Sequence, residues 1–240
     1  MSNPVFLADD LAPDRVDLTG PEGRHAATVR RLRVGEAVDL VDGQGTRATC
    51  VVCAVGKDRI TCDVLARTTE PLPALRVVLV QALAKGDRGE LAVELATEVG
   101  VDVVVPWSAS RSVVRWEGER GEKALARWRS TAREAGKQSR RARHPEVTAV
   151  ATTAEVTALL RAAALGLVLH ESAKTSLAGI DLPAVGDVVV VVGPEGGFSD
   201  LELGVFEPAT VVRLGPSVLR TSTAGAVATA VVSARSGRWD

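Results

Sequence analysis

The chain has 240 residues, of which 46% are hydrophobic, so it can bury the core of one large domain or two modest ones without disulfides. No stretch approaches the roughly 20 apolar residues of a membrane span, and the N-terminus does not resemble a signal peptide, so we expect a cytoplasmic protein with no membrane partner. The net charge of −1 hides a basic segment, residues 111–144, with eleven Lys/Arg against four Asp/Glu, which is either a solvated helix face or a surface for a polyanion.

Residues 1–72 are expected to form a small β-rich domain. From Val34 onward, apolar and polar residues alternate, and the turn clusters DGQG and GKDR interrupt them, which predicts hairpins. Pro71 and Pro73 then break the pattern, and we place the domain boundary there.

The three cysteines are interpreted as packing residues. Cys50 and Cys53 have C-x-x-C spacing, but they lie in a β-like run, where residues three apart point to opposite faces. No second pair and no nearby histidine completes a zinc set, and an odd count with Cys62 gives no disulfide framework. We therefore expect no metal.

Residues 73–240 are expected to form an α/β domain. Apolar strands alternate with helical segments, which is typical of a parallel sheet covered on both faces. The strands are predicted at 75–83, 101–107, 166–170, 188–193 and 211–215, and the helices at 89–100, at 122–139 and after Thr221. Thr221, Ser222 and Thr223 are expected to cap the last helix.

Glycine or polar loops follow three of these strands: GPEGGF after 188–192, the Gly215-Pro216 turn, and HES after 166–169. Because ligands of α/β sheets bind at the carboxyl ends of strands, the three loops can line one crevice, although each glycine loop can also be a tight turn without a ligand. GPEGGF matches no phosphate-binding pattern, and Glu195 would repel an anion. A neutral or cationic ligand fits better.

GPEGGFSDLEL together with LGPSVLRTSTA closely resembles the paired signatures of the bacterial 16S rRNA uridine-N3 methyltransferase family, in the SPOUT superfamily of S-adenosylmethionine enzymes. The resemblance extends over nearly the whole chain, through KGDRGELAVELATEVGVDVVVPWSASRSVV and REAGKQSRR to HAATVRRLRVGEAVDLVDGQG, which is similar to a PUA-like RNA-binding module. It implies a C-terminal trefoil knot, a homodimer, and 16S rRNA in the 30S subunit as substrate.

Position by position, the resemblance implies which residues bind S-adenosylmethionine. These are His170, Glu171, Gly193, Glu195, Gly196, Gly197, Leu214, Gly215, Ser217, Leu219 and Thr221. Two positions depart from the family. Ser222 stands where an acidic residue is usual, and Ser139 stands where a cysteine is common, which argues against covalent catalysis from that position.

Arg220 is the candidate catalytic residue, because its planar guanidinium can face the uracil oxygens or the target phosphate. The alternative is a structural ion pair with Glu195 or Glu171. RNA contacts are expected from basic residues of both domains, with recognition of RNA shape because aromatic residues are few. They are Arg30, Arg31, Arg33, Arg111, Arg115, Lys137, Arg140, Arg141 and Arg143.

Two other functions remain open from the sequence. The same cofactor loops can serve a SPOUT methyltransferase that acts on tRNA or on a ribose 2′-hydroxyl. A non-catalytic RNA-binding ribosome-assembly factor would keep the fold and lose cofactor affinity.

Overall fold

The computed structural model describes residues 3–239 and divides into two compact units. The first unit comprises the chain up to Leu72 together with Gly136–His144, and the second comprises Pro73–Ala135 and the chain from Pro145 onward. Within the described residues, no helix has the length and apolar character that crossing a bilayer requires.

The first unit is a five-stranded sheet in the order β1-β3-β4-β5-β2. Only β1 and β3 pair in parallel. Its elements are β1 (Val5–Leu7), β2 (Arg15–Leu18), α1 (Gly20–Arg24), η1 (His25–Val29), β3 (Ala37–Val41), β4 (Thr46–Val55) and β5 (Ile60–Thr69). The turns at 42–45 and 56–59 join the predicted hairpins, whereas the helical stretch α1–η1 was not predicted.

The core of the first unit contains Cys50 and Cys62, as predicted for packing residues. Burial raises the pKa of Cys50 to about 11 and that of Cys62 to about 12, so both thiols stay protonated near neutral pH. Cys53 is half-buried and its thiol contacts the Thr61 carbonyl at 3.4 Å. Across residues 3–239, no group of three or more His, Cys, Asp or Glu is arranged to hold a metal ion.

The segment Gly136–His144 returns to the first unit and packs on the β3–β4 turn. The Gly45 amide donates to the Ala142 carbonyl at 3.0 Å, and the His144 amide donates to the Gly43 carbonyl at 2.9 Å. The division of the chain at Leu72 therefore leaves out one segment of the first unit, which follows later in the sequence.

The second unit is built on a seven-stranded, fully parallel sheet in the order β10-β12-β9-β11-β6-β7-β8. The strands are β6 (Leu75–Ala82), β7 (Val103–Trp107), β8 (Glu146–Val147), β9 (Leu165–Leu169), β10 (Thr175–Ser176), β11 (Gly186–Val192) and β12 (Thr210–Arg213). The longer strands lie where the apolar runs predict them, and the α/β class is confirmed.

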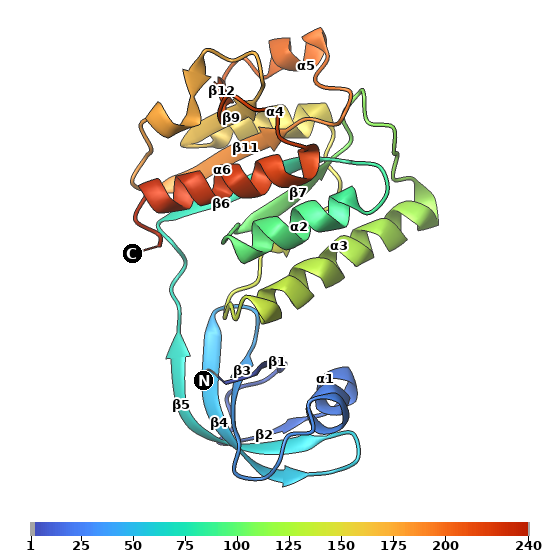
Figure 1. Cartoon of the computed structure of the whole chain (residues 1–240), viewed down its shortest axis with the longest axis vertical. Coiled ribbons are helices and arrows are strands. Elements are labelled where there is room, and N and C mark those ends of the chain that lie inside the picture. Colours follow the sequence, from blue (N-terminus) through green and yellow to red (C-terminus); the bar gives the residue numbers. More distant parts are fainter. Residues whose placement is uncertain (1–2, 240) are drawn as a thin grey trace. The chain divides into compact units, whose positions relative to one another are not determined.

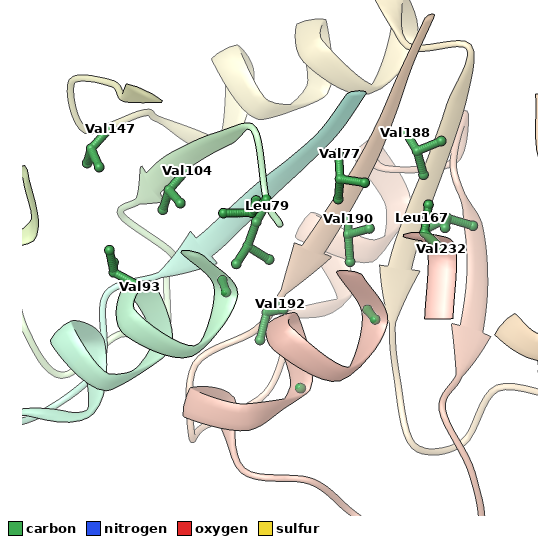
Figure 2. Packing of buried hydrophobic residues seen from close by; sticks show 14 of the residues in the cluster. Val77, Leu79, Val93, Val104, Val147, Leu167, Val188, Val190, Val192 and Val232 are labelled. Carbon is green, nitrogen blue, oxygen red and sulfur yellow. The ribbon is translucent and has the colours of Figure 1, made fainter. Parts of the chain in front are cut away.

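Helices cover both faces of this sheet, because successive valines of a central strand face opposite ways. Val188 and Val190 pack with α2, α3 and α6, as Figure 2 shows for several partners, while Val189 and Val191 pack with α4 and Phe206. Helices α2 and α6 lie side by side (Figure 1). The helical elements are α2 (Arg88–Glu98), α3 (Gly118–Gln138), α4 (Thr153–Ala162), η2 (Leu177–Gly179), α5 (Asp200–Val205) and α6 (Thr221–Arg235).

Two details of the helices differ from the prediction. Helices α4 and α5 were missed, although each begins with a capping box, Thr152 with Glu155 and Ser199 with Glu202. The prediction that Thr221, Ser222 and Thr223 cap α6 is wrong. The N-cap residue is Arg220, whose side chain makes no capping hydrogen bond, and the Thr221 hydroxyl donates to the Gly193 carbonyl. The trefoil knot stays a prediction.

Candidate cofactor site

A cavity of about 560 Å³ lies at the carboxyl ends of β9, β11 and β12 and beside the first turn of α6. The loops after the three strands meet there, as their position in a parallel sheet predicts. The structure brings together the whole predicted cofactor set: His170, Glu171, Gly193, Glu195, Gly196, Gly197, Leu214, Gly215, Ser217, Leu219 and Thr221.

The first loop, Gly193–Phe198, has glycines for different physical reasons. A Cβ on Gly193 would come within 2.8 Å of the Phe198 ring, and one on Gly196 within 3.2 Å of Arg111. Gly197 has a φ of 68°, a left-handed conformation that favours glycine. Two of these glycines thus permit close approach, and the third permits the turn.

Glu195 in this loop is paired with Arg88 at the start of α2. The Arg88 Nη1 lies 3.4 Å from Glu195 Oε1, and both side chains are partly exposed. Arg111 holds the same loop from another side, donating from Nη1 to the Gly196 carbonyl at 3.2 Å. We call the Gly193–Phe198 loop the cradle. The negative charge of Glu195 in the cradle is therefore partly neutralised by Arg88, which also lines the cavity.

The second loop, Leu214–Arg220, has few such contacts. A Cβ on Gly215 would meet no atom within 4 Å, and the Val218 side chain is 76% exposed. Across residues 3–239, the side chains of Ser217 and Arg220 make no hydrogen bond or ion pair with the protein. Polar groups of this loop are available to a ligand.

Arg220 lies between the second loop and α6, and its side chain lines the cavity. The alternative that it pairs with Glu195 or Glu171 is wrong for this structure, since Arg88 takes Glu195 and no described residue pairs with Arg220. Ser222, next but one, is only 3% exposed, so a side chain at this position faces the protein interior.

His170 at the end of β9 has a defined orientation. Its Nδ1 accepts from the Ser172 amide at 3.2 Å and lies 2.8 Å from the Ser172 hydroxyl, and its ring packs at a tilt against Phe198. Because Nδ1 is an acceptor, the neutral ring carries its proton on Nε2.

Glu202 in α5 is a supporting residue that the sequence did not suggest. Its carboxylate accepts from the Ser110 amide at 2.7 Å and from the Ser199 amide at 2.8 Å. Burial acts to raise the pKa of Glu202, but these hydrogen bonds outweigh it and hold the pKa below its usual range. Glu202 thereby ties the exit of the first loop to the loop after β7; the S-x-x-E capping box was its sequence signal.

Comparison with known proteins agrees with this geometry. Residues 70–233 match the model of an RNA methyltransferase domain, and residues 18–65 match that of an RNA methyltransferase PUA domain. The ribosomal RNA small subunit methyltransferase E of Mycobacterium tuberculosis is 47% identical, over 98% of this chain and 93% of that protein.

The chain belongs to the ribosomal RNA small subunit methyltransferase E family.

Two further relatives of this family support the match. The Bacillus subtilis protein of the same name is 30% identical, over 90% of this chain and 88% of its own. A crystal structure of the Neisseria gonorrhoeae protein bound to S-adenosyl methionine is 30% identical, with a TM-score of 0.85 and 98% of each chain covered.

In this methyltransferase, the predicted RNA-contacting residues fall into two groups. Arg30, Arg31, Arg33 and Arg140 are exposed in the first unit, where Arg141 is half-buried. Arg31 and Arg140 have φ angles of 54° and 58°, a strained conformation for a residue with a side chain. Two predicted sets distant in sequence thus belong to one unit.

Lys137, Arg143 and Arg115 make structural contacts within the protein. Lys137 is buried and its ammonium lies 2.5 Å from Glu22, and Arg143 donates to the Glu70 carbonyl at 2.9 Å. Arg115 donates to the Ala109 and Ser110 carbonyls at 2.6 and 3.0 Å. These three side chains have structural contacts that a phosphate would have to replace, so we leave them out of the RNA surface. Arg111 is exposed and lines the cavity, but its guanidinium donates to the Gly196 carbonyl at 3.2 Å, so it is left out for the same reason.

Proposed function

We propose that this protein transfers a methyl group from S-adenosylmethionine to N3 of a uridine in 16S rRNA of the 30S subunit. The observation that carries the proposal is the cavity at three strand ends. Arg220 lies on its wall, and its side chain has no ion-pair partner among residues 3–239. Family membership and the relatives' names support ribosomal RNA as the substrate.

The residues around the cavity suit this cofactor. The volume of about 560 Å³ falls within the roughly 300–1,000 Å³ typical of small-molecule sites. Gly193 and Gly196 let the first loop pack closely against Phe198 and Arg111, which fixes the shape of this wall, and Glu195 offers a carboxylate to a sulfonium cation. When bound, S-adenosylmethionine would supply an activated methyl group and leave as the neutral thioether S-adenosylhomocysteine, while N3 of the uracil accepts the methyl group and loses its proton to water.

Arg220 has the catalytic role in this proposal. Negative charge develops on the uracil oxygens as the N3 proton is lost, and a guanidinium with no side-chain partner among residues 3–239 can donate hydrogen bonds to one of these oxygens. Glu195 cannot do this, since a carboxylate would repel the same charge. The remaining task is alignment of the two reactants, which the packed first loop favours.

The RNA surface is proposed to comprise the exposed arginines of the first unit, Arg30, Arg31, Arg33 and Arg140. Arginine pairs well with phosphate, and these contacts make affinity dependent on salt. A location in the cytoplasm and a homodimer complete the proposal. The resemblance implies the homodimer, and sedimentation of the purified protein tests it.

The decisive experiment is methylation of 30S particles taken from a strain that lacks the gene, followed by primer extension across 16S rRNA. A methyl group on uridine N3 blocks the base-pairing edge and arrests reverse transcriptase. One new arrest that needs both protein and S-adenosylmethionine is the expected result. Methylation of tRNA or of a ribose would replace this function with another, and no cofactor binding by calorimetry would indicate an assembly factor.

A further inference from the structure

Gln81 is a fully buried polar residue at the end of strand β6, among valines and leucines. Its side-chain amide donates from Nε2 to the Thr221 hydroxyl at 3.0 Å and to the Ala82 carbonyl at 3.3 Å. The Thr221 hydroxyl in turn donates to the carbonyl of Gly193 at 2.9 Å. Three segments distant in sequence, β6, the first loop and α6, are therefore joined by one chain of hydrogen bonds.

The directions of these hydrogen bonds are determined by their ends. The Gly193 carbonyl can only accept, so the single hydroxyl proton of Thr221 is used there. The Thr221 oxygen must then accept from Gln81, and the Ala82 carbonyl also requires a donor. Turning the amide over would place Gln81 Oε1 against two acceptors, so the orientation with Nε2 as donor is the one that satisfies all partners.

This orientation leaves Gln81 Oε1 buried and, within residues 3–239, without a hydrogen-bond partner. A buried carbonyl oxygen without a partner is destabilising, and an apolar side chain of the same shape would avoid that cost. Helix α6 approaches closely here, since a Cβ on Gly225 would lie 2.8 Å from Leu79 and 3.4 Å from Gln81 Oε1. Stability of the core alone does not account for a glutamine at this position.

The two ends of the chain of hydrogen bonds lie at the cavity. Gly193 is the first residue of the first loop, and Thr221 directly follows Arg220. We propose that Gln81 is a positioning residue, which holds the Gly193 carbonyl and the start of α6 in register so that the first loop and Arg220 face the same ligand. We call the hydrogen bonds from Gln81 through Thr221 to Gly193 the relay. This inference rests on the proposed function, because it assigns the relay to cofactor binding and methyl transfer.

The test uses Gln81→Met, which keeps the length of the side chain and removes both donors and the orphan carbonyl. We expect the Kd for S-adenosylmethionine in calorimetry to rise about tenfold, in the usual range for coupled polar groups, while the melting temperature stays the same or rises. The single-turnover rate on 30S particles at saturating cofactor should fall as well, because Arg220 adjoins the relay.

A second variant and a control keep the test decisive. Thr221→Val removes the middle of the relay, and the double variant should lose no more affinity than the worse single variant. Thr157→Val is the matched control: its buried hydroxyl donates to the Thr153 carbonyl at 2.8 Å in α4, and cofactor affinity should not change. If Gln81→Met cannot be purified folded, Gln81→Leu, which also removes the donor to Thr221 and lies outside the cavity lining, carries the test by showing the same loss.

Three results would overturn the relay: wild-type affinity and rate in Gln81→Met, additive losses in the double variant, or an equal loss of affinity in Thr157→Val. Failure of the wild-type protein itself to bind S-adenosylmethionine is a different outcome. It would remove the proposed function and not only the role of Gln81.

Discussion

The loop from Gly193 to Phe198 is held by its neighbours along most of its length, whereas the loop from Leu214 to Arg220 is largely exposed. Phe198 packs over Gly193, and Arg88 and Arg111 contact Glu195 and Gly196. The second loop has open space at Gly215. One wall of the cavity is thus preformed, while the other keeps polar groups unpaired, as expected where a ligand must supply their partners.

The largest effect is expected when the preformed wall is filled. Gly196→Val places a branched side chain where even a Cβ lies 3.2 Å from Arg111, so S-adenosylmethionine binding should fall below detection by calorimetry while circular dichroism shows a folded protein. Gly215→Val is the comparison: a Cβ at this position meets no atom within 4 Å beyond its chain neighbours, so the melting temperature of this variant should match the wild type. Unchanged affinity in Gly196→Val would mean that the first loop is not the cradle.

Removing the unpaired arginine should affect chemistry and not binding. Arg220→Ala is expected to lose roughly 2–4 kcal/mol of transition-state stabilisation in single-turnover methylation, as for an oxyanion donor, with little change in cofactor affinity. Arg220→Lys should recover part of the rate, since it keeps the charge and not the planar fork. An alanine variant within a few-fold of wild type would remove Arg220 from the catalytic role.

Acid should loosen the first loop through Glu202, whose pKa is held below its usual range. Its hydrogen bonds contribute stability above the unfolded pKa of about 4.3, and that stability is lost as the pH falls through the folded value. Glu202→Gln should be less stable than wild type by about 1–3 kcal/mol at pH 7 and should approach it at low pH. Thermal melts of both proteins from pH 7 to pH 3 measure this difference in stability. A difference between wild type and Glu202→Gln that does not become smaller at low pH would contradict the prediction.

The smallest effect concerns the charge in the cradle. If Glu195 favours a sulfonium, Glu195→Gln should bind S-adenosylmethionine about twofold more weakly and leave the neutral product S-adenosylhomocysteine unaffected, since a partly exposed charge contributes about 0.5 kcal/mol. Arg88→Ala removes the ion-pair partner of Glu195. It should therefore increase the preference for S-adenosylmethionine over S-adenosylhomocysteine, whereas Glu195→Gln decreases it. The ratio of the dissociation constants of the two ligands, measured at low salt, tests this prediction. An equal loss of affinity for both ligands would mean that Glu195 contributes through packing and not through its charge.

The local sequence determined the strands and the place of the ligand site. Runs such as Val188–Val192 are too apolar for a half-exposed strand, and a parallel sheet brings the loops that follow its strands to one edge, so the cavity could be predicted from Gly193 and Gly215. The turn clusters after Val41 and Val55 likewise specified the hairpins of the first unit.

Only the tertiary structure decided which polar groups meet. Lys137 belongs to a basic run, yet it is buried against Glu22, because Gly136–His144 packs on the first unit. Thr221 was expected to cap a helix, yet its hydroxyl donates to the Gly193 carbonyl and accepts from the Gln81 amide. Each of these contacts joins residues far apart along the chain, and periodicity and propensity carry information only about neighbours in sequence, so pairings across the fold were decided by packing.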